Sequence, residues 1–463
     1  MNKIIEQLYF AAPVAVQDVL VSAYGYKLYN ERYGGNHNRY LSELLASQYF
    51  NAGRIRELVD SSFIKMFRHA VENVPYYRQL VRDGRIDLQA VKSVDDLCRI
   101  PILTKEQIRN DPEAFLASGF GSGQLIKIGT SGTTGKTLTI YIDKDSRRRA
   151  YAFFSRFKAW FGIDPSLPNV TFAGRVFVEP DRKTPPFWRR NRVSNNYLFS
   201  SYHLSPATLP SYVEALLKIQ PHFIDSYPSS IYTIAKYMQD NGISGIFPKA
   251  IITSSETLLE HQRRTIEEVF RCPVADQYGC AEQVVFVSQC EKGTYHVHPE
   301  FGVVEFLRED GSEAEPGEQA RLVCTGFTND AMPLIRYEMG DVGVRSSEEC
   351  ACGRSFPSIK QIIGRMDDTL ITGDGRRIGR LDPVFKGLKS VIEAQIVQED
   401  YENIVLYIVP GRDFQMGHAQ TVVSELRKRL GSSMKVRVEL VDEIARTSSG
   451  KFRAVVSKIV RAS

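Results

Sequence analysis

The sequence has no hydrophobic run long enough to cross a membrane. A membrane-spanning helix needs about 20 consecutive apolar residues, and no part of the 463-residue chain contains such a run. Residues 1–23 are fairly apolar, but Glu6, Gln17 and Asp18 interrupt them and no cleavage site follows. We therefore expect no signal peptide and no stable membrane insertion, and we predict a cytoplasmic protein. For this N-terminal stretch, packing on the protein is favoured over transient contact with a membrane surface.

The chain also lacks a strong excess of charge of one sign. It has 59 Lys and Arg against 54 Asp and Glu, so its net charge is +5. Nucleic-acid-binding proteins usually concentrate basic residues on one face, and we therefore expect no nucleic-acid partner. The run Arg147, Arg148 and Arg149 is predicted to form a solvated helix face.

Cysteines are few, and their number is odd. Seven cysteines without a signal peptide do not indicate a disulfide framework. We expect four of them to be packing residues: Cys98, Cys272, Cys280 and Cys324.

Hydrophobic residues make up 43% of the sequence, enough for a large core, and their spacing changes along the chain. Residues 1 to 100 carry apolar residues three or four apart, which is typical of helices, and Thr104 is a predicted helix N-cap. From 128 to 364, short apolar runs alternate with helical stretches, which favours α/β layers. Strands are predicted at 169–178, 222–227, 250–254, 303–307 and 321–325, and helices at 145–161, 209–217, 231–241 and 260–270.

A stretch rich in glycine and hydroxyl groups lies between two apolar runs. Glycines let the backbone turn tightly and bring its N–H groups close to an anion, while the hydroxyls and a lysine add donors and one positive charge. These features suit a polyphosphate ligand. For the stretch taken alone, a hairpin turn with a solvated lysine is the alternative. The predicted phosphate loop consists of Thr130, Ser131, Gly132, Thr133, Thr134, Gly135 and Lys136.

This stretch is not a Walker A motif, which needs GxxxxGK[ST] at the start of a helix. Thr130 stands where the first glycine of that pattern should be. The core TSGTTGK instead resembles the phosphate loop of the adenylate-forming (acyl-activating) superfamily. The segments NVPYYRQL and SVDDLCRIPILTKEQIR resemble the phenylacetate–CoA ligase-like branch, some of whose members are linked to capsule polysaccharide biosynthesis.

The resemblance implies a fold class and a division into domains. We expect an α/β protein in which a large N-terminal α/β adenylation domain is joined by a hinge to a small C-terminal α+β domain. Residues 1–100 would form the helical N-terminal region of the large domain, and residues 101–364 the core that binds ATP and an acid. Residues 365–463 would form the small mobile domain. A homodimer is left open.

The second motif runs from Asp276 to Glu282. Tyr278 offers a flat face for a purine, Gly279 turns the chain, and Glu282 offers an oxygen to Mg²⁺. Taken alone, a strand end with a buried tyrosine and a surface glutamate is the better explanation. Placed after the phosphate loop, the motif resembles the superfamily's Tyr-Gly-x-Thr/Ser-Glu element. Ala281 stands where that element has a hydroxyl, which puts catalytic efficiency in doubt but not nucleotide binding.

Two further segments complete the predicted nucleotide pocket. Ser254 and Glu256 close a predicted strand, and they resemble the family's element on the adenine side, although Glu256 fits a helix N-terminal acid equally well. Asp341 follows a glycine turn in a segment that matches the family's Tyr-x-x-Gly-Asp. An ionised aspartate can accept both ribose hydroxyls, so Asp341 is the predicted ribose ligand, with an ordinary turn aspartate as the alternative.

The last two motifs lie towards the C-terminus. Gly364 to Asp368 resembles the family's hinge, in which Arg365 would contact the nucleotide and Asp367 would be the pivot; an ordinary charged turn is the alternative. Lys451 lies on a loop of small residues, where its compact charge can reach a distant anion. In the family this lysine neutralises charge at the α-phosphate during adenylation. The resemblance therefore implies Lys451, Glu282 and Asp367 as catalytic residues.

Two cysteine-containing stretches combine the ligands of a zinc site. Cys290 is followed by His296 and His298, and Cys350 and Cys352 come later in a polar loop. Such a loop is a poor place for buried apolar cysteines, and three thiols with one imidazole make a tetrahedral Zn²⁺ set. The spacing is not that of a standard zinc finger, and cysteines that pack as small hydrophobes are the alternative. We predict structural zinc at Cys290, His296, Cys350 and Cys352, with His296 favoured over His298.

The resemblance implies ATP- and Mg²⁺-dependent conversion of a small-molecule carboxylic acid to an acyl-adenylate, with release of pyrophosphate. Acyl transfer to a thiol would follow, and CoA is the favoured acceptor although no residue marks it. Transfer to an amine, such as an amino sugar, and a nucleotide-binding protein without turnover are the alternatives. Tyr202, His203 and Tyr227 lie in segments that resemble pocket-forming stretches of the family; they would line an aryl pocket or serve equally well as ordinary core residues.

Overall fold

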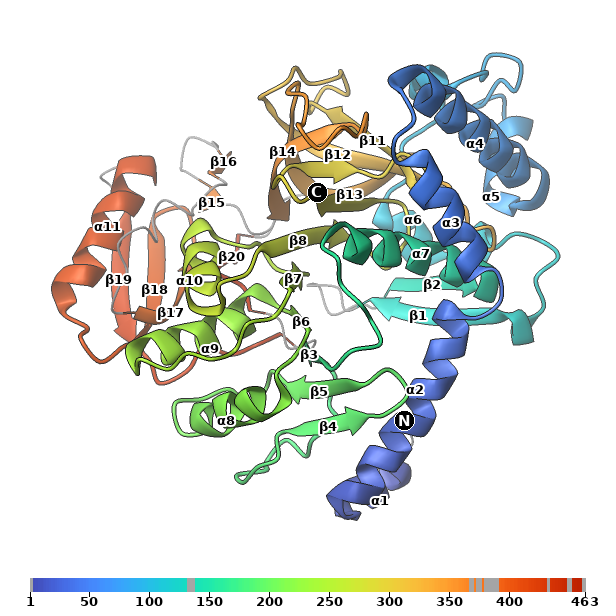
Figure 1. The fold of residues 1–463 in the computed structure, drawn as a ribbon. Helices are drawn as coiled ribbons and strands as arrows, with labels where there is room; N and C mark the ends of the chain where they lie inside the picture. Colours follow the sequence, from blue (N-terminus) through green and yellow to red (C-terminus); the bar gives the residue numbers. More distant parts are fainter. Residues whose placement is uncertain are drawn as a thin grey trace. The chain divides into compact units, whose positions relative to one another are not determined.

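The computed structural model describes residues 3–130, 138–365, 370–371, 377–378, 391–430, 434–447 and 452–459. Two compact units make up the chain, each assembled from separate stretches of sequence (Figure 1). Unit 1 contains Met1–Val21, Pro165–Val274 and Ile363–Ser463. Unit 2 contains Ser22–Asp164 and Ala275–Ile362. Both units combine helices with β-strands, and the predicted α/β fold class is confirmed.

Unit 1 contains strands in the order β4-β5-β3-β6-β7. Strands β5, β3, β6 and β7 run parallel, whereas β4 is antiparallel to β5. Helices connect β5 to β6 and β6 to β7, whereas the chain passes from β3 to its parallel neighbour β5 through β4. The elements are β3 (Asn169–Ala173), β4 (Trp188–Asn191), β5 (Asn196–Ser200), α8 (Leu209–Ile219), β6 (Phe223–Ser226), α9 (Pro228–Asp240), β7 (Ala250–Ser254) and α10 (Glu260–Phe270).

Burial explains why these stretches form a layered fold. Strand β7 begins with four consecutive buried residues, as expected for a parallel strand covered on both faces. Helices α9 and α10 pack against each other (Figure 1). Their apolar residues, among them Ile231, Met238 and Phe270, share one hydrophobic core with those of the strands.

The N-terminal helix α1 (Lys3–Ala11) and the beginning of α2 (Val14–Tyr33) contact this unit. The hydroxyl of Tyr9 donates to the carbonyl of Phe177 (2.8 Å). The buried guanidinium of Arg189 donates to the side-chain oxygen of Gln17. These contacts confirm the prediction that the N-terminal stretch packs on the protein.

The C-terminal part of unit 1 has its own sheet, in the order β19-β18-β17-β20. Strands β17 and β18 are antiparallel, and β19 and β20 join them in parallel. Helix α11 contributes Val422 and Leu426 to a core shared with these strands. The elements are β15 (Leu370–Ile371), β16 (Arg377–Ile378), β17 (Val391–Gln398), β18 (Asn403–Pro410), α11 (Met416–Leu430), β19 (Lys435–Leu440) and β20 (Val455–Ser457).

Unit 2 begins with helices, as predicted from the spacing of its apolar residues. Thr104 caps α6 as expected: its hydroxyl accepts a hydrogen bond from the N–H of Gln107, and the Gln107 side chain accepts one from the N–H of Thr104. The helices are α3 (His37–Ser47), α4 (Ala52–Asn73), α5 (Pro75–Arg82), α6 (Lys105–Asn110) and α7 (Lys144–Trp160), with 3₁₀ helices η1 (Val94–Arg99), η2 (Pro112–Phe115) and η3 (Ser122–Gln124).

The strands of unit 2 form a hairpin of β1 and β2 and a series in the order β11-β12-β13-β14-β10-β9-β8. The pairs β11–β12, β12–β13, β14–β10, β10–β9 and β9–β8 are antiparallel. The strands are β1 (Leu125–Thr130), β2 (Leu138–Asp143), β8 (Val274–Gly279), β9 (Phe286–Gln289), β10 (Tyr295–Val297), β11 (Gly302–Leu307), β12 (Gln319–Gly326), β13 (Tyr337–Arg345) and β14 (Ser358–Arg365).

The expectation of a solvated arginine face on α7 is wrong. Arg147 pairs with Glu31 (3.2 Å), and only 13% of its side chain is exposed. Arg149 pairs with Asp330 (3.1 Å). The sequence alone suggested solvated arginines because their acidic partners lie far away along the chain.

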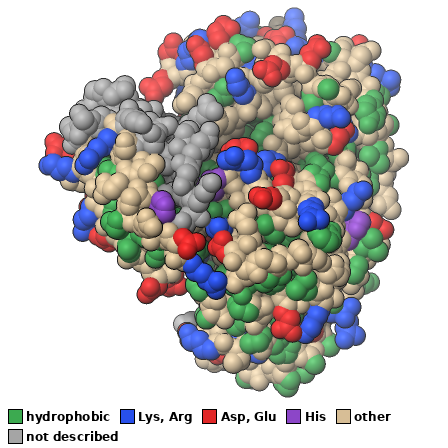
Figure 2. All heavy atoms as spheres, turned by 60° about the vertical axis from the view of Figure 1, so that its left-hand side comes forward, with side chains coloured by type: hydrophobic (Ala, Val, Ile, Leu, Met, Phe, Trp, Pro, Cys, Tyr) green, Lys and Arg blue, Asp and Glu red, His purple; other side chains and the backbone are tan. Residues whose placement is uncertain are grey.

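Charges of both signs are interspersed on the face drawn in Figure 2, with apolar side chains scattered between them. Among the described residues, no helix combines the length and the apolar character that crossing a membrane requires. All seven cysteines lie in the described part of the chain, and none forms a disulfide.

Candidate functional site

The predicted phosphate loop lies between two paired strands. Strands β1 and β2 are antiparallel, and Thr130 at the end of β1 is paired with Leu138 at the start of β2. Leu138, Ile140 and Ile142 alternate inwards along β2 and are fully buried. The hydrophobic core of unit 2 therefore fixes both ends of this hairpin. Ser131 to Lys136 and the side chain of Thr130 lie outside the described residues.

Two side chains predicted to contact the nucleotide form a hydrogen-bonded pair. The hydroxyl of Tyr278, at the end of β8, donates to Oδ2 of Asp341 on β13 over 2.6 Å. Burial raises the pKa of Tyr278 well above its ordinary value, and the nearby Asp341 carboxylate adds to this effect. Tyr278 therefore keeps its proton and acts as the donor. Gly340, just before Asp341, has φ +75°, a conformation that favours glycine.

The predicted magnesium ligand is held by a residue that the sequence analysis did not assign. Glu282 is 6% exposed, and its Oε1 accepts a hydrogen bond from the hydroxyl of Tyr337 (3.0 Å). Tyr337 lies on β13, four residues before Asp341, so one strand positions both carboxylates. Tyr337 is the first residue of the Tyr-x-x-Gly-Asp segment, and this position is the sequence feature that could have identified it. Gly279 ends β8 beside Tyr278.

In unit 1, Ser254 ends β7 and Glu256 lies in the turn that follows. Both carboxylate oxygens of Glu256 accept backbone hydrogen bonds, one from Ser229 (3.0 Å) and the other from Phe452 (2.5 Å). These contacts between distant segments could not be foreseen from the sequence.

Besides the phosphate loop, three predicted site residues carry no described side-chain geometry. The backbone of Arg365 ends β14, but nothing is described of its side chain. Asp367 and Lys451 lie outside the described residues. Their roles stay predictions from the resemblance.

The predicted acid-binding residues split into two groups. Tyr202 and Tyr227 both bind the backbone of one residue: the Tyr202 hydroxyl donates to the carbonyl of Gly174 (3.1 Å), and the Gly174 N–H donates to the Tyr227 hydroxyl (3.2 Å). His203 is buried, with its ring nitrogens near Ser200 Oγ (2.8 Å) and the carbonyl of Glu179 (3.0 Å).

Burial also lowers the pKa of His203, so its ring is neutral near pH 7. A neutral ring with both nitrogens in hydrogen bonds is held in one orientation. Gly174, which follows β3, was not predicted as a site residue.

The cysteines and histidine predicted to bind zinc lie together in unit 2. The ligand atoms of Cys290, His296, Cys350 and Cys352 all lie within 4.8 Å of one another. The Sγ atoms of Cys290 and Cys350 are 3.6 Å apart, and Sγ of Cys352 is 3.3 Å from Nε2 of His296. In a tetrahedral site with Zn–S bonds of about 2.3 Å, neighbouring sulfurs lie about 3.8 Å apart. The four residues therefore fit a zinc ion.

The surroundings of this cluster distinguish the two histidines. Nδ1 of His296 lies 3.3 Å from the carbonyl of Phe356, which leaves Nε2 directed at the cluster, as is usual for a ligating histidine. His298 lies between other partners, with Nδ1 near Arg156 (2.6 Å) and Nε2 near Ser288 Oγ (2.8 Å). The geometry thus brings His296, the favoured candidate, to the cysteines.

Comparison with known proteins identifies relatives over nearly the whole chain. A sequence family described as the CapK C-terminal domain matches residues 370–458. Protein CapK of Staphylococcus aureus is 29% identical over 458 residues, which cover 98% of this chain and 99% of the relative. The phenylacetate–coenzyme A ligase of Thermus thermophilus is 23% identical and covers 87% of this chain and 96% of the relative.

Solved structures share the fold. A 2-hydroxyisobutyryl-CoA ligase, determined in a postadenylation state with an acyl-AMP, superposes with a TM-score of 0.71 at 20% identity and covers 89% of this chain and 91% of that enzyme. At this identity the likeness shows the fold alone. The resemblance drawn from the sequence motifs is confirmed by these relatives and structures together.

Proposed function

We propose that this homologue of CapK and of the phenylacetate–CoA ligases, which has the fold of the adenylate-forming ligases, activates a carboxylic acid with ATP and transfers the acyl group to a thiol. The observation that carries the proposal is the arrangement on β13. Tyr337 holds Glu282 and Asp341 holds Tyr278, so two carboxylates and an aromatic ring of the predicted nucleotide pocket are fixed by one strand.

Each group in this arrangement has a task in nucleotide binding. The ring of Tyr278 offers a stacking face for adenine. The side chain of Asp341 offers two acceptor oxygens, which suit ribose hydroxyls. The Glu282 carboxylate suits Mg²⁺, which would supply positive charge to the phosphates. Lys136 and the hydroxyls of residues 130–134 are proposed to bind the phosphates.

The first half-reaction joins the acid to AMP. A carboxylate oxygen of the acid attacks the α-phosphorus of ATP, the bond from that phosphorus to the bridging oxygen breaks, and pyrophosphate leaves. Charge repulsion between the two anions makes up much of the barrier, so positioned cations and donors matter most. Lys451 is proposed to neutralise charge at the α-phosphate.

The second half-reaction consumes the acyl-adenylate. The sulfur of the acceptor attacks the acyl carbon, the bond from that carbon to the AMP oxygen breaks, AMP leaves, and the thiol proton passes to solvent. CoA is the proposed acceptor. Asp367 is proposed as the pivot of the domain movement between the two half-reactions.

For the acid pocket we propose the surface around the backbone of Gly174, where Tyr202 and Tyr227 converge. Two phenol rings at one backbone position offer flat apolar faces to an aryl or short branched acid. His203 would not contact the acid; it would support this surface through its hydrogen bonds with Ser200 and the carbonyl of Glu179. The zinc proposed at the Cys/His cluster is structural, because four protein ligands leave no open position.

The test is ATP–pyrophosphate exchange with labelled pyrophosphate and a panel of aryl, aliphatic, hydroxy and amino acids. We expect exchange that depends on one class of acid and that Lys451→Ala loses. Adding CoA, a carrier thiol or an amino sugar to the acid that supports exchange then identifies the acceptor by the product formed. ATP binding without exchange for any acid would favour a protein without turnover, and failure to bind ATP would overturn the proposal.

A further inference from the structure

The second pair of cysteines in the Cys/His cluster lies on a tight turn of unit 2. The N–H of Gly353 donates to the carbonyl of Cys350 over 3.4 Å, which closes the turn around Cys352. Gly353 has φ +77°, a conformation that favours glycine. The next residue along the chain is Arg354, so the turn decides where this arginine lies.

The guanidinium of Arg354 lies beside Cys352 and is almost inaccessible to water. Only 3% of the Arg354 side chain is exposed. It interacts with the side chain of Cys352 through a hydrogen bond and through its charge. It also donates to both carboxylate oxygens of Glu291 (2.9 and 3.1 Å), and its guanidinium carbon lies 4.1 Å from the centre of the Trp160 ring. The turn thus places a buried cation beside one of the predicted zinc ligands.

Two other ligands of the cluster have backbone partners. The N–H of Lys292 donates to Sγ of Cys290 (3.4 Å), and Nδ1 of His296 lies 3.3 Å from the carbonyl of Phe356. Partners of this kind orient the ligands of a metal site and adjust their basicity. A backbone group carries no net charge. Arg354 differs from these partners because it brings a full positive charge to its ligand.

This charge matters because zinc alone does not neutralise the cluster. A zinc ion with three thiolates and a neutral imidazole carries a net negative charge. Cys290 and His296 are only 2% and 1% exposed, and a charge is costly to bury unless an opposite charge lies near it. Arg354 supplies that opposite charge. The side chain of Glu291 is 36% exposed, so solvent screens its charge more strongly than that of Arg354.

We propose that Arg354 stabilises the zinc-bound cluster by balancing the charge of its thiolates, chiefly that of Cys352, without itself binding the metal. The proposal rests on the zinc site of the proposed function. It assigns to Arg354 a role beyond its ion pair with Glu291 and its packing on Trp160. A role limited to that pair and that packing would make the affinity for zinc independent of the charge on this side chain.

The first measurement is the Kd for zinc of the full chain, obtained by competition with a chromophoric chelator at neutral pH. Arg354→Met removes the charge and keeps an unbranched apolar side chain against Trp160. We expect its Kd to rise about 10- to 100-fold. Arg354→Lys keeps the charge but loses the planar set of donors, and its Kd should lie between those of wild type and Arg354→Met.

Glu291→Gln is the matched control, because it breaks the same ion pair and leaves Arg354 charged. Its Kd for zinc should not rise. Equal rises in Arg354→Met and Glu291→Gln would assign the effect to the ion pair, and no rise in Arg354→Met would assign none to the charge; either result overturns the proposal. Circular dichroism checks that the variants are folded, and Arg354→Gln takes the place of Arg354→Met if that variant is not.

Cobalt provides a readout that packing alone does not move. Co²⁺ accepts the same thiolate and imidazole ligands, and it absorbs light through charge transfer from the sulfurs. Loss of a positive charge beside a thiolate makes its electrons easier to transfer. This absorption band should therefore move to longer wavelength in Arg354→Met and keep its wild-type position in Glu291→Gln.

An unmoved band in cobalt-loaded Arg354→Met overturns the proposal even if the protein is a ligase. A wild-type chain that binds neither zinc nor cobalt overturns both the metal site and the role of Arg354. Neither result bears on ATP–pyrophosphate exchange, so a failure of the proposed ligase reaction and a failure of this proposal are told apart.

Discussion

The hydroxyl of Tyr278 lies 2.6 Å from a carboxylate oxygen of Asp341 and donates a hydrogen bond to it. The two residues come from β8 and β13, and they belong to two motifs that the sequence analysis assigned to adenine and ribose. If the proposed nucleotide pocket is correct, this hydrogen bond orients the adenine and ribose partners relative to each other before the nucleotide binds.

Tyr278→Phe is expected to weaken nucleotide binding while leaving the ring in place. The variant removes the donor that orients Asp341, and a hydrogen bond to a charged group is worth about 1.5–3 kcal/mol. We expect the Kd for ATP, measured by calorimetry, to rise about 10-fold. Tyr295→Phe is the matched control, because the Tyr295 hydroxyl also donates to a carboxylate, that of Asp276 (2.7 Å), and neither residue is a predicted nucleotide ligand. Equal effects of the two substitutions would contradict the assignment.

Purified protein is expected to contain one zinc ion per chain, and Cys352→Ser to lose it. A structural site that binds only the folded state stabilises that state, so the melting temperature should fall on the order of 5 °C. Metal content by atomic emission and thermal melting provide the measurement. Cys98 is exposed, so the expectation that it packs in the core is wrong, and Cys98→Ser should change neither quantity. Wild-type protein that contains no zinc, and that melts at the same temperature with a chelator, would refute the metal site.

The buried pair of Arg156 and Glu300 is expected to dominate the stability of its surroundings. Arg156 is fully buried, and its guanidinium donates to Glu300 (2.7 Å) and to the carbonyl of Leu44 (3.1 Å). Glu300→Ala leaves this charge without its carboxylate, which should cost about 3–5 kcal/mol in urea denaturation.

The double substitution Arg156→Met with Glu300→Met should restore much of that loss, because no buried charge is left uncompensated. Glu214→Ala removes an exposed carboxylate that pairs with Lys218, and it should leave the denaturation midpoint unchanged. A loss for Glu300→Ala as small as that for Glu214→Ala would show that the pair does not stabilise the fold.

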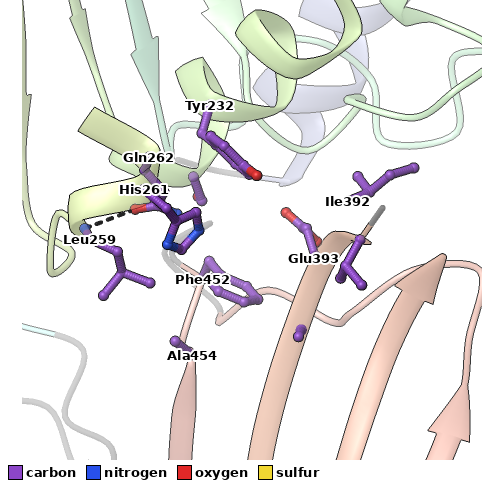
Figure 3. Close-up of a pocket in the computed structure, with 11 residues that line it drawn as sticks. Tyr232, Leu259, His261, Gln262, Ile392, Glu393, Phe452 and Ala454 are labelled. Atoms are coloured by element: carbon purple, nitrogen blue, oxygen red, sulfur yellow. Dashed lines mark hydrogen bonds between the residues drawn. The ribbon is translucent and has the colours of Figure 1, made fainter. Parts of the chain in front are cut away.

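His261 is expected to make the protein less stable as the pH falls. Burial, with a smaller effect from Arg264, lowers the pKa of His261 to about 4. It packs edge-on against Tyr232 (centroids 5.4 Å apart) and shares a pocket with Glu393 (Figure 3). His261 takes up a proton near pH 6.5 in the unfolded chain but only near pH 4 in the folded chain. The neutral ring therefore destabilises the folded state only below pH 6.5, and the free energy of unfolding falls as the pH drops from 6.5 to 4.

His261→Gln removes the contribution of His261 to the pH dependence of stability. From pH 6.5 to 4 the melting temperature of wild type should fall more steeply than that of the variant, with the two compared from a common reference at pH 7.5. Parallel curves would mean that His261 titrates alike in the folded and unfolded chains.

Local patterns predicted much of this structure. Strand β7 and helix α10 coincide with the predicted ranges 250–254 and 260–270. Strand β7 is a short continuous apolar run, and α10 buries Gln262, Ile266 and Phe270 at helical spacing. The Cys/His cluster was found because thiols in a polar loop conflict with ordinary packing. The phosphate loop was placed between two strands, and β1 and β2 flank it.

What the sequence could not predict depends on pairs that only the fold brings together. Glu282 and Tyr337 are each recognisable within a motif, yet their hydrogen bond depends on β13. Arg156 looks like one more basic residue of α7 until Glu300 is found beside it. Glu256 was assigned to adenine by resemblance, whereas its bonds to Ser229 and Phe452 follow from the tertiary arrangement of unit 1.

The way the chain is divided between its two units has a consequence for its synthesis. Unit 2 draws on residues up to Ile362, and unit 1 on residues up to the last. A ribosome that adds about 5–20 residues per second needs about 20 to 70 s to reach Ile362. Unit 2 cannot be completed earlier, because Leu138 of β2 shares its core with residues as late as Ile359. The early apolar residues of that core must therefore wait with their side chains exposed. Nascent chains should therefore be a target for chaperones, and exchanging a unit with a relative would require several crossover points instead of one.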